Sequence, residues 1–156
     1  MSSESKFESA LAAIVGGEHV IAGDAPEAAD FCHDEALTAA PQTPAWVVSP
    51  GSAEQVAELL ALATKEGFPV TARGSGSGLA GAGVAPEGGV IISMRRMNKI
   101  LSIDEVNHVA VVEPGVTLQE LEDETARLGL VYPVYPGEMS ATIGGNIATN
   151  AGGMRA

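Results

Sequence analysis

Apolar residues recur at every third or fourth position in two stretches of the first half of the chain, and this period predicts two amphipathic helices. The first covers residues 4–15 and ends at Gly16, because glycine readily adopts the left-handed conformation that closes a helix. The second covers about 53–66. Ser52 precedes it with a glutamine three residues later, which is the spacing of a capping box, and Gly67 ends it.

The second half of the chain contains two more candidate helices. Thr117 and Glu120 have capping-box spacing ahead of an apolar stripe, which predicts a helix over about 118–128. A short helix is predicted over 143–149. The intervening residues 130–135 are expected to be extended, since proline bars this stretch from the middle of a sheet.

Short apolar runs between the helices predict five strands. These runs cover residues 45–49, 68–72, 90–92, 100–103 and 109–112. A helix separates the first two strands, and such a strand–helix–strand arrangement favours a right-handed parallel unit. Only short turns separate the last three strands, so these three are expected to form an antiparallel sheet. The stretch from 22 to 44 shows no sustained period and is predicted to be a surface loop.

Composition narrows the class of protein. The 156 residues, of which 46% are hydrophobic and 18% charged, can build one core but hardly two. The formal net charge of −12 argues against a surface that binds nucleic acid or anionic lipid. No stretch is apolar and long enough to span a membrane and no secretory signal is visible, so a cytoplasmic location is expected. The single cysteine, Cys32, cannot form an internal disulfide, so any redox chemistry must come from a cofactor.

The spacing of the histidines and carboxylates does not indicate a catalytic or metal site. His19, His33 and His108 are far apart and lack ligand spacing, so no metal site is expected. Adjacent carboxylates such as Asp34-Glu35 are predicted to be solvated charges, because paired acid and base work needs a convergence that sequence does not show.

Residues 73–89 hold seven glycines and one proline, which excludes a helix or a central strand. The glycines at positions 76, 78 and 81 match the dinucleotide-binding fingerprint, but the helix that this fingerprint requires does not follow. Small residues at 74–78 instead expose successive backbone N–H groups that favour an anion, with Arg73 at the entrance. The segment 73–99 is also net positive, with four basic residues against one acidic residue. A mobile surface loop is the alternative interpretation.

A second glycine cluster lies near the end of the chain. Residues 142–146 start the predicted short helix, where free N–H groups and the helix dipole favour an anion. Residues 150–153 form another run of small residues, Asn-Ala-Gly-Gly. The two clusters together suggest two walls around one phosphate-bearing ligand.

Three ordered motifs carry a resemblance to a known family. They are ARGSGSGLAGAGVAPEGGVIISMRRMNKIL, VAVVEPGVTLQEL and YPVYPGEMSATIGGNIATNAGGMR. Over about residues 45–156 the chain resembles the PCMH-type FAD-binding domain of FAD-linked oxidases. The nearest branch is that of the glycolate oxidase D-subunit, D-lactate dehydrogenase and D-2-hydroxyglutarate dehydrogenase. The fold expected is α+β: a small parallel βαβ subdomain followed by an antiparallel sheet with a crossing helix.

The resemblance implies that FAD is held largely by backbone amides of the two glycine clusters. The residues it places at the cofactor are Arg73, Gly74, Ser75, Gly76, Ser77, Gly78, Leu79, Pro114, Gly115, Ser140, Thr142, Ile143, Gly144, Gly145, Asn146, Ala148, Asn150 and Gly153. Members that tether FAD covalently commonly have a histidine where this chain has Ser77, so non-covalent binding is expected. Tyr135 stands where related branches often have aspartate, which weakens the assignment of that segment. No residue is assigned a catalytic role.

The resemblance also implies a reaction and a domain organisation. The reaction is oxidation of a 2-hydroxy acid, with hydride passing to flavin N5 and then to another acceptor. Residues 1–44 are expected to form an N-terminal helix and loop. Residues 45–156 are expected to form the FAD-binding domain, incomplete at its C-terminal end and without the substrate-binding cap domain. The chain is therefore expected to be an N-terminal fragment that is inactive alone.

Two functions remain open from the sequence. In the first, the partners are a small hydroxy-acid substrate in the intact protein and a partner subunit or electron acceptor. In the second, the chain is a truncated, non-catalytic module that binds flavin or docks onto a partner subunit.

Overall fold

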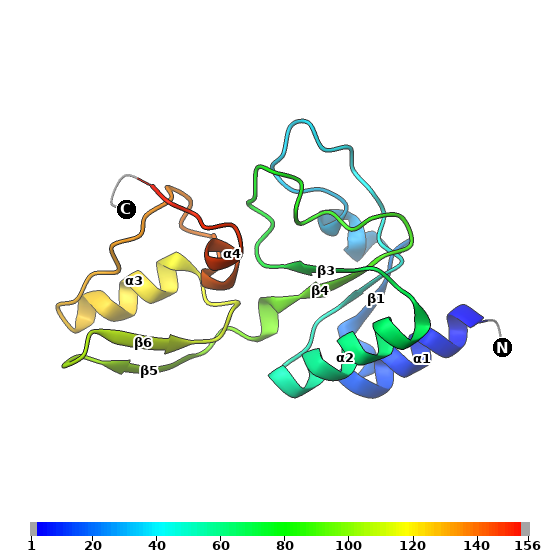
Figure 1. Cartoon of the computed structure of the whole chain (residues 1–156), viewed down its shortest axis with the longest axis horizontal. Helices are drawn as coiled ribbons and strands as arrows, with labels where there is room; N and C mark the ends of the chain where they lie inside the picture. The colour runs from blue at the N-terminus through cyan, green and yellow to red at the C-terminus, as the bar shows by residue number, and fades with distance from the viewer. Residues whose placement is uncertain (1–2, 154–156) are drawn as a thin grey trace. The chain divides into compact units, whose positions relative to one another are not determined.

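The computed structural model describes residues 3–153 and divides after Arg96 into two compact units. The first unit is built on a four-stranded sheet with the order β1-β2-β4-β3 (Figure 1). Its strands are β1 (Val20–Ala22), β2 (Trp46–Val48), β3 (Val70–Arg73) and β4 (Val90–Ser93). Strands β2 and β3 both pair in parallel with β4, and β1 pairs antiparallel with β2.

The position of β4 corrects one expectation. The sequence predicts an antiparallel sheet for residues 90–92, whereas β4 lies between two parallel neighbours. Every residue of β4 is buried, and a central parallel strand is typically a continuous apolar run rather than an alternating one. Strand β1 has no counterpart among the predicted strands, because three half-buried residues are too few to show a period.

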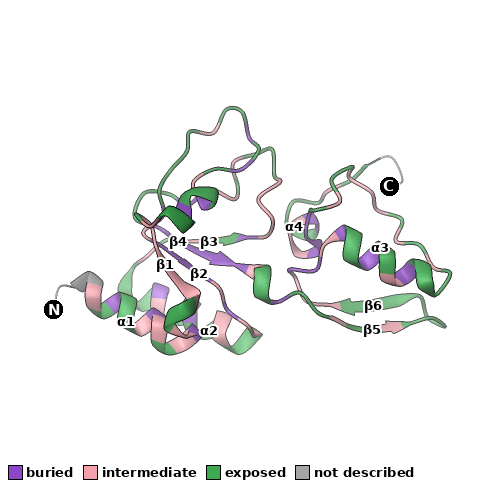
Figure 2. Ribbon diagram, turned by 180° about the vertical axis from the view of Figure 1, so that it is seen from behind, coloured by how far each residue is buried: buried purple, intermediate pink, exposed green. Residues whose placement is uncertain are grey.

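The central strands β2 and β4 are buried on both faces, since all their residues are buried and successive residues of a strand point to opposite sides of the sheet. Helices α1 (Ser3–Val15) and α2 (Ala53–Glu66) cover one face (Figure 1). The buried apolar residues there are Phe7, Leu11, Val15, Trp46, Val48, Leu59, Val90 and Ile92. On the other face, Val47 and Ile91 pack with the 3-10 helix η2 (Pro26–Phe31), which lies inside the segment predicted to be a loop. Figure 2 shows the buried band that runs through β2 and β4.

Helix α2 begins and ends where the sequence predicts. The Ser52 hydroxyl accepts a hydrogen bond from the N–H of Gln55 at 3.3 Å, and Gly67 ends the helix with φ +79°. The Gln55 side chain, however, does not complete a capping box. Its Oε1 accepts from the N–H of Gly51 at 2.7 Å, and its Nε2 donates to the Ile14 carbonyl at 2.9 Å. This glutamine therefore ties α2 to the end of α1.

The second unit consists of the hairpin β5 (Ile100–Asp104) and β6 (Val109–Val112) with helices α3 (Leu118–Arg127) and α4 (Ile143–Ala148) (Figure 1). The hairpin is antiparallel, as predicted. The predicted capping box at the start of α3 is complete, because Thr117 and Glu120 each accept from the other's backbone N–H. The core of this unit is formed by Val116, Leu118, Leu121, Ala141 and Ile143.

The predicted class is confirmed: the fold is α+β, with a parallel unit followed by an antiparallel pair and a helix. Two short 3-10 helices, η1 (Gly17–His19) and η3 (Met94–Arg96), complete the first unit. Within residues 3–153, no helix has the length and apolar character needed to cross a membrane.

The packing of Phe7 in the core of the first unit predicts that this side chain contributes strongly to stability. The Phe7 ring stacks on Phe68 at a centroid distance of 4.0 Å and lies 5.1 Å from the ring of Trp46. We expect Phe7→Ala to lower the free energy of unfolding by about 3–5 kcal/mol, because it leaves a cavity among these rings. Urea unfolding followed by the fluorescence of Trp46 measures the change. Leu37→Ala is the control, since Leu37 is fully exposed and its loss is expected to cost less than about 0.5 kcal/mol. Similar losses in the two variants would contradict the described packing of α1.

Candidate functional site

The glycine-rich loop leaves the C-terminal end of β3, and residues 74–89 contain no helix or strand, as predicted. Gly76 has φ +86°, a conformation that disfavours any residue with a side chain. A Cβ atom at this position would lie 2.2 Å from Nη2 of Arg73. The structure therefore requires glycine at position 76 because its backbone rests directly against the Arg73 guanidinium.

Arg73 does not stand at the entrance of the loop, which corrects the expectation from sequence. Its side chain is buried at 4% exposure. Nη1 donates to the carbonyl of Gly83 at 3.0 Å, Nη2 donates to the carbonyl of Asp30 at 2.8 Å, and the guanidinium carbon lies 5.5 Å from the centre of the Phe31 ring. The loop folds around this arginine because the guanidinium needs carbonyl partners once it is removed from water. Burial, and then repulsion from Arg95, lowers the pKa of Arg73, although an arginine stays charged at neutral pH.

Residues 30–36 pack against the same loop and were missed as functional by sequence reasoning. Asp34 is buried at 8% exposure rather than solvated. Its Oδ1 accepts from the N–H of Ala36 at 3.0 Å, and its Oδ2 accepts from the N–H of Gly83 at 3.4 Å. The N–H of Glu35 donates to the carbonyl of Gly78 at 3.0 Å. Nothing in the local sequence marks Asp34, because its partner in the loop, Gly83, lies 49 positions away.

The backbone N–H groups at the start of this loop are available to a ligand. Among the residues that the structure describes, the N–H groups at 74–79 donate to no protein acceptor. Gly74, Ser75, Gly76 and Ser77 are half-buried. A run of amides without acceptors is the chemistry that a pyrophosphate requires, so the residues of this loop fit the phosphate part of FAD.

The start of α4 does not offer the free amides that the sequence predicts. The N–H of Ile143 donates to the Val116 carbonyl at 2.8 Å, and that of Gly144 donates to the Pro114 carbonyl at 2.9 Å. The N–H of Gly145 donates to the N-cap hydroxyl of Thr142 at 3.3 Å. The N–H groups predicted to be free at this helix start are therefore occupied, and contact of residues 142–146 with FAD stays a prediction. These amides are used to pack α4 against the segment that precedes α3.

The glycines of this region serve the same close packing. A Cβ atom on Gly144 would lie 2.7 Å from Cβ of Pro114, and one on Gly153 would lie 1.8 Å from the carbonyl oxygen of Tyr135. The structure thus brings Pro114 and Gly144 together, as the predicted site requires. Ser140, Ala148 and Asn150 are exposed, and their contact with a cofactor stays a prediction.

Asn146 is the feature of α4 that fits a ligand. The residue is buried at 8% exposure, and its Nδ2 is buried without a hydrogen-bond partner. A buried amide donor without an acceptor is unfavourable, so native proteins rarely keep one without a use. The polar edge of a flavin or the hydroxyls of its ribityl chain would supply the missing acceptor.

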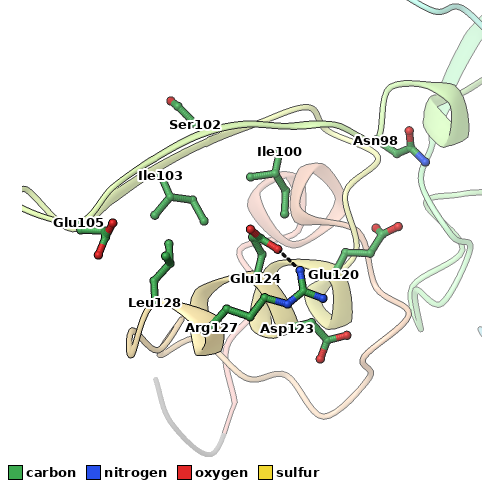
Figure 3. Close-up of a pocket in the computed structure, with 10 residues that line it drawn as sticks. All are labelled: Asn98, Ile100, Ser102, Ile103, Glu105, Glu120, Asp123, Glu124, Arg127 and Leu128. Carbon is green, nitrogen blue, oxygen red and sulfur yellow. Dashed lines mark hydrogen bonds and ion pairs between the residues drawn. The ribbon is translucent and has the colours of Figure 1, made fainter.

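The second unit also contains a groove that lies away from the predicted cofactor residues. It has a volume of about 660 Å³ and runs between β5 and α3 (Figure 3). Its lining residues are Asn98, Ile100, Ser102, Ile103, Glu105, Glu120, Asp123, Glu124, Arg127 and Leu128. Arg127 is paired with Glu124 (Figure 3), which leaves the polar lining predominantly acidic. The groove contains none of the predicted cofactor residues, and its acidity is unsuited to a pyrophosphate. Within residues 3–153 no cluster of acidic, histidine or cysteine side chains is arranged to hold a metal ion.

Comparison with known proteins identifies the family. The family model described as FAD binding domain matches residues 44–156. The chain therefore belongs to this family of FAD-binding domains from FAD-linked oxidoreductases, and FAD is its cofactor. The predicted branch is also confirmed, because the relatives include proteins named D-lactate dehydrogenase, glycolate oxidase subunit and D-2-hydroxyglutarate dehydrogenase.

Three of these similar proteins show how far the likeness extends. An uncharacterised FAD-linked oxidoreductase of Mycobacterium tuberculosis is 54% identical over 153 residues, which are 97% of this chain and 33% of that protein. A D-lactate dehydrogenase of Anaerostipes hadrus is 46% identical over 127 residues, 81% of this chain and 27% of that protein. A solved structure of alkyldihydroxyacetonephosphate synthase is 26% identical with a TM-score of 0.85, over 96% of this chain and 30% of that one. The chain spans about a third of the length of the relatives it matches.

Because Nδ2 of Asn146 has no hydrogen-bond partner, we expect its removal to affect FAD binding far more than stability. Asn146→Ala is expected to change the stability of the flavin-free chain by less than about 1 kcal/mol, because no hydrogen bond is lost. The same change is expected to weaken FAD binding about tenfold, the equivalent of one hydrogen bond. Thermal unfolding and calorimetric titration with FAD measure the two quantities, with the exposed Asn98→Ala as control. A large loss of stability with unchanged affinity would assign Asn146 to packing alone.

Proposed function

We propose that this chain is the FAD-binding part of a flavin-dependent oxidoreductase that oxidises a 2-hydroxy acid of the glycolate or D-lactate type. The observation that carries the substrate class is the 46% identity with a protein named D-lactate dehydrogenase, over 81% of this chain. When bound, FAD would supply the redox chemistry by accepting a hydride, that is one proton with two electrons, from the carbon that bears the hydroxyl group, while the hydroxyl proton is lost and a carbonyl group forms.

The residues of the chain would bind and orient the cofactor. The N–H groups at 74–79 would donate to the pyrophosphate, since they have no protein acceptor among the described residues. The buried Nδ2 of Asn146 would donate to a polar atom of the flavin or ribityl part. The remaining predicted residues of the second unit, among them Pro114 and Gly144, would line the flavin through close backbone packing. Each of these roles is orientation and electrostatics rather than bond making.

We expect FAD to be bound without a covalent bond. Ser77 occupies the position of the tethering histidine found in covalent members of the family, and its hydroxyl shares a hydrogen bond with the hydroxyl of Ser75 at 3.1 Å. Acid precipitation of the FAD-loaded chain is therefore expected to leave all of the flavin absorbance in the supernatant. Yellow colour that stays with the washed precipitate would contradict this.

We expect the chain alone to be inactive as an oxidoreductase. A carboxylate substrate must be held within about 3–3.5 Å of the reacting atoms, which requires convergent cationic groups. Arg73 is engaged with backbone carbonyls, Arg96 donates to the carbonyl of Ser49 at 2.7 Å, and Arg127 pairs with Glu124. Within residues 3–153 we find no other cluster of basic residues that could hold the substrate carboxylate. The relatives are about three times as long as this chain.

Dye reduction tests this proposal. With D-lactate or glycolate as electron donor, the FAD-loaded chain is expected to give no reduction above the rate of free FAD. The intact protein that contains this sequence is expected to reduce the dye with D-lactate or glycolate and to bleach its flavin absorbance under anaerobic conditions. Turnover by the chain alone would contradict the expected inactivity. A failure of the intact protein to act on any 2-hydroxy acid, with FAD bound, would favour the non-catalytic binding module.

A further inference from the structure

We propose that Arg73 is a positioning residue, which locks the glycine-rich loop onto residues 30–36 and so keeps its free backbone N–H groups in place for FAD. This inference rests on the proposed role of residues 74–79 in binding the cofactor. It assigns to Arg73 no contact with FAD.

The loop is held in place by contacts at Gly76, Gly78 and Gly83. None of these contacts uses the N–H groups at 74–79. At Gly76 the backbone rests on the Arg73 guanidinium. At Gly78 the carbonyl accepts from the N–H of Glu35, and at Gly83 the carbonyl accepts from Arg73 while the N–H donates to Asp34. Arg73 reaches across to the Asp30 carbonyl as well, so a single side chain joins the loop to the preceding segment. These contacts use the carbonyls of Gly78 and Gly83 and the N–H of Gly83, and they leave the N–H groups at 74–79 without a protein acceptor among the described residues.

The Arg73 guanidinium is held by backbone carbonyls rather than by an ion pair. Its hydrogen-bond partners are carbonyls, and no carboxylate in the described residues lies within 4.0 Å of its guanidinium. Asp30 and Asp34 act on it from farther away, and the cationic Arg95 lies on the same Phe31 ring at 4.9 Å. The Asp34 carboxylate contacts the same loop at Gly83 and offsets the positive charge of Arg73 there, so the role of Arg73 is to hold the loop in place. Replacing Arg73 would remove its two hydrogen bonds to the loop and to Asp30.

Residues 30–36, which contact the glycine-rich loop, lie outside the part of the chain that matches the FAD-binding family. Asp30, Asp34 and Glu35 precede residue 44, where the family match begins. The order of the cofactor loop therefore depends on residues that the FAD-binding family model does not span. A chain cut to residues 44–156 would retain every predicted cofactor residue and lack the contacts that Asp30, Asp34 and Glu35 make with Arg73 and the loop.

Two variants test the proposal on the whole 156-residue chain. Arg73→Met removes the guanidinium, and Asp34→Ala removes an acceptor of the Gly83 N–H while leaving Arg73 in place, so it applies even if the first variant does not fold. Arg127→Met and Asp24→Ala are the matched controls, because both native side chains are exposed. Backbone ¹⁵N relaxation without flavin reports the order of the loop, calorimetric titration reports FAD affinity, and thermal unfolding reports global stability.

In the wild type we expect order parameters of about 0.85 at residues 75–79, which is the value of rigid backbone. Arg73→Met and Asp34→Ala are expected to lower them below about 0.6 and to weaken FAD binding at least about tenfold. The controls are expected to change neither quantity. A purely structural role would lower the unfolding temperature and leave the order of the loop in the folded chain unchanged.

Two other results separate the inference from the proposed function. If both variants keep the wild-type loop order and FAD affinity, the role of Arg73 is wrong and the cofactor role of the loop stands. If the wild-type chain, with a rigid loop, binds no FAD, the proposed cofactor role of the loop fails, and the inference fails with it.

Discussion

A backbone N–H group that is removed from water must find an acceptor, and the two glycine-rich segments meet this constraint in opposite ways. At the start of α4, successive N–H groups donate to the carbonyls of Val116 and Pro114 and to the hydroxyl of Thr142. In the loop after β3, the N–H groups at 74–79 have no acceptor among the described residues, while loop carbonyls are bonded. One segment uses its donors to pack, and the other leaves them without a protein acceptor.

The retained donors depend on a buried arginine. A loop rich in glycine has high conformational freedom, so holding its backbone in one arrangement requires contacts along its length. Arg73 makes two of these contacts with one planar group that carries several donors in a fixed geometry, which lysine does not have. The glycine at position 76 is required by this arrangement, because a side chain there would occupy the place of the guanidinium.

Local signals in the sequence account for much of the fold. Capping residues and C-terminal glycines define α2 and α3 to within about one residue, because these signals act within a single turn. The parallel pairing of β4 was not predictable from its neighbours, because its partners in the sheet are distant in sequence. Gln55 has the spacing of a capping box, yet its side chain bonds to Gly51 and Ile14 because tertiary contacts compete with local ones.

The candidate site follows the same division between local and distant information. The glycine composition of residues 74–78 predicts a loop with available N–H groups, and in the structure these groups have no acceptor among the described residues. The burial of Arg73 and Asp34 does not follow from their neighbours, because their partners come from another part of the chain. The short helix α4 is where predicted, but its amides are occupied by a segment almost 30 positions earlier. Sequence locates the glycines, and tertiary packing decides which of them leave a donor free.

The central claim is that the free donors of the first glycine-rich loop receive the phosphates of FAD. Titration of the ¹⁵N-labelled chain with FAD, followed by amide chemical shifts, tests this claim most directly. The account predicts large downfield shifts of the amide protons at residues 74–79, with much smaller changes at 143–145, whose protons are already bonded. Large shifts at 143–145 with an unchanged loop at 74–79 would contradict the account.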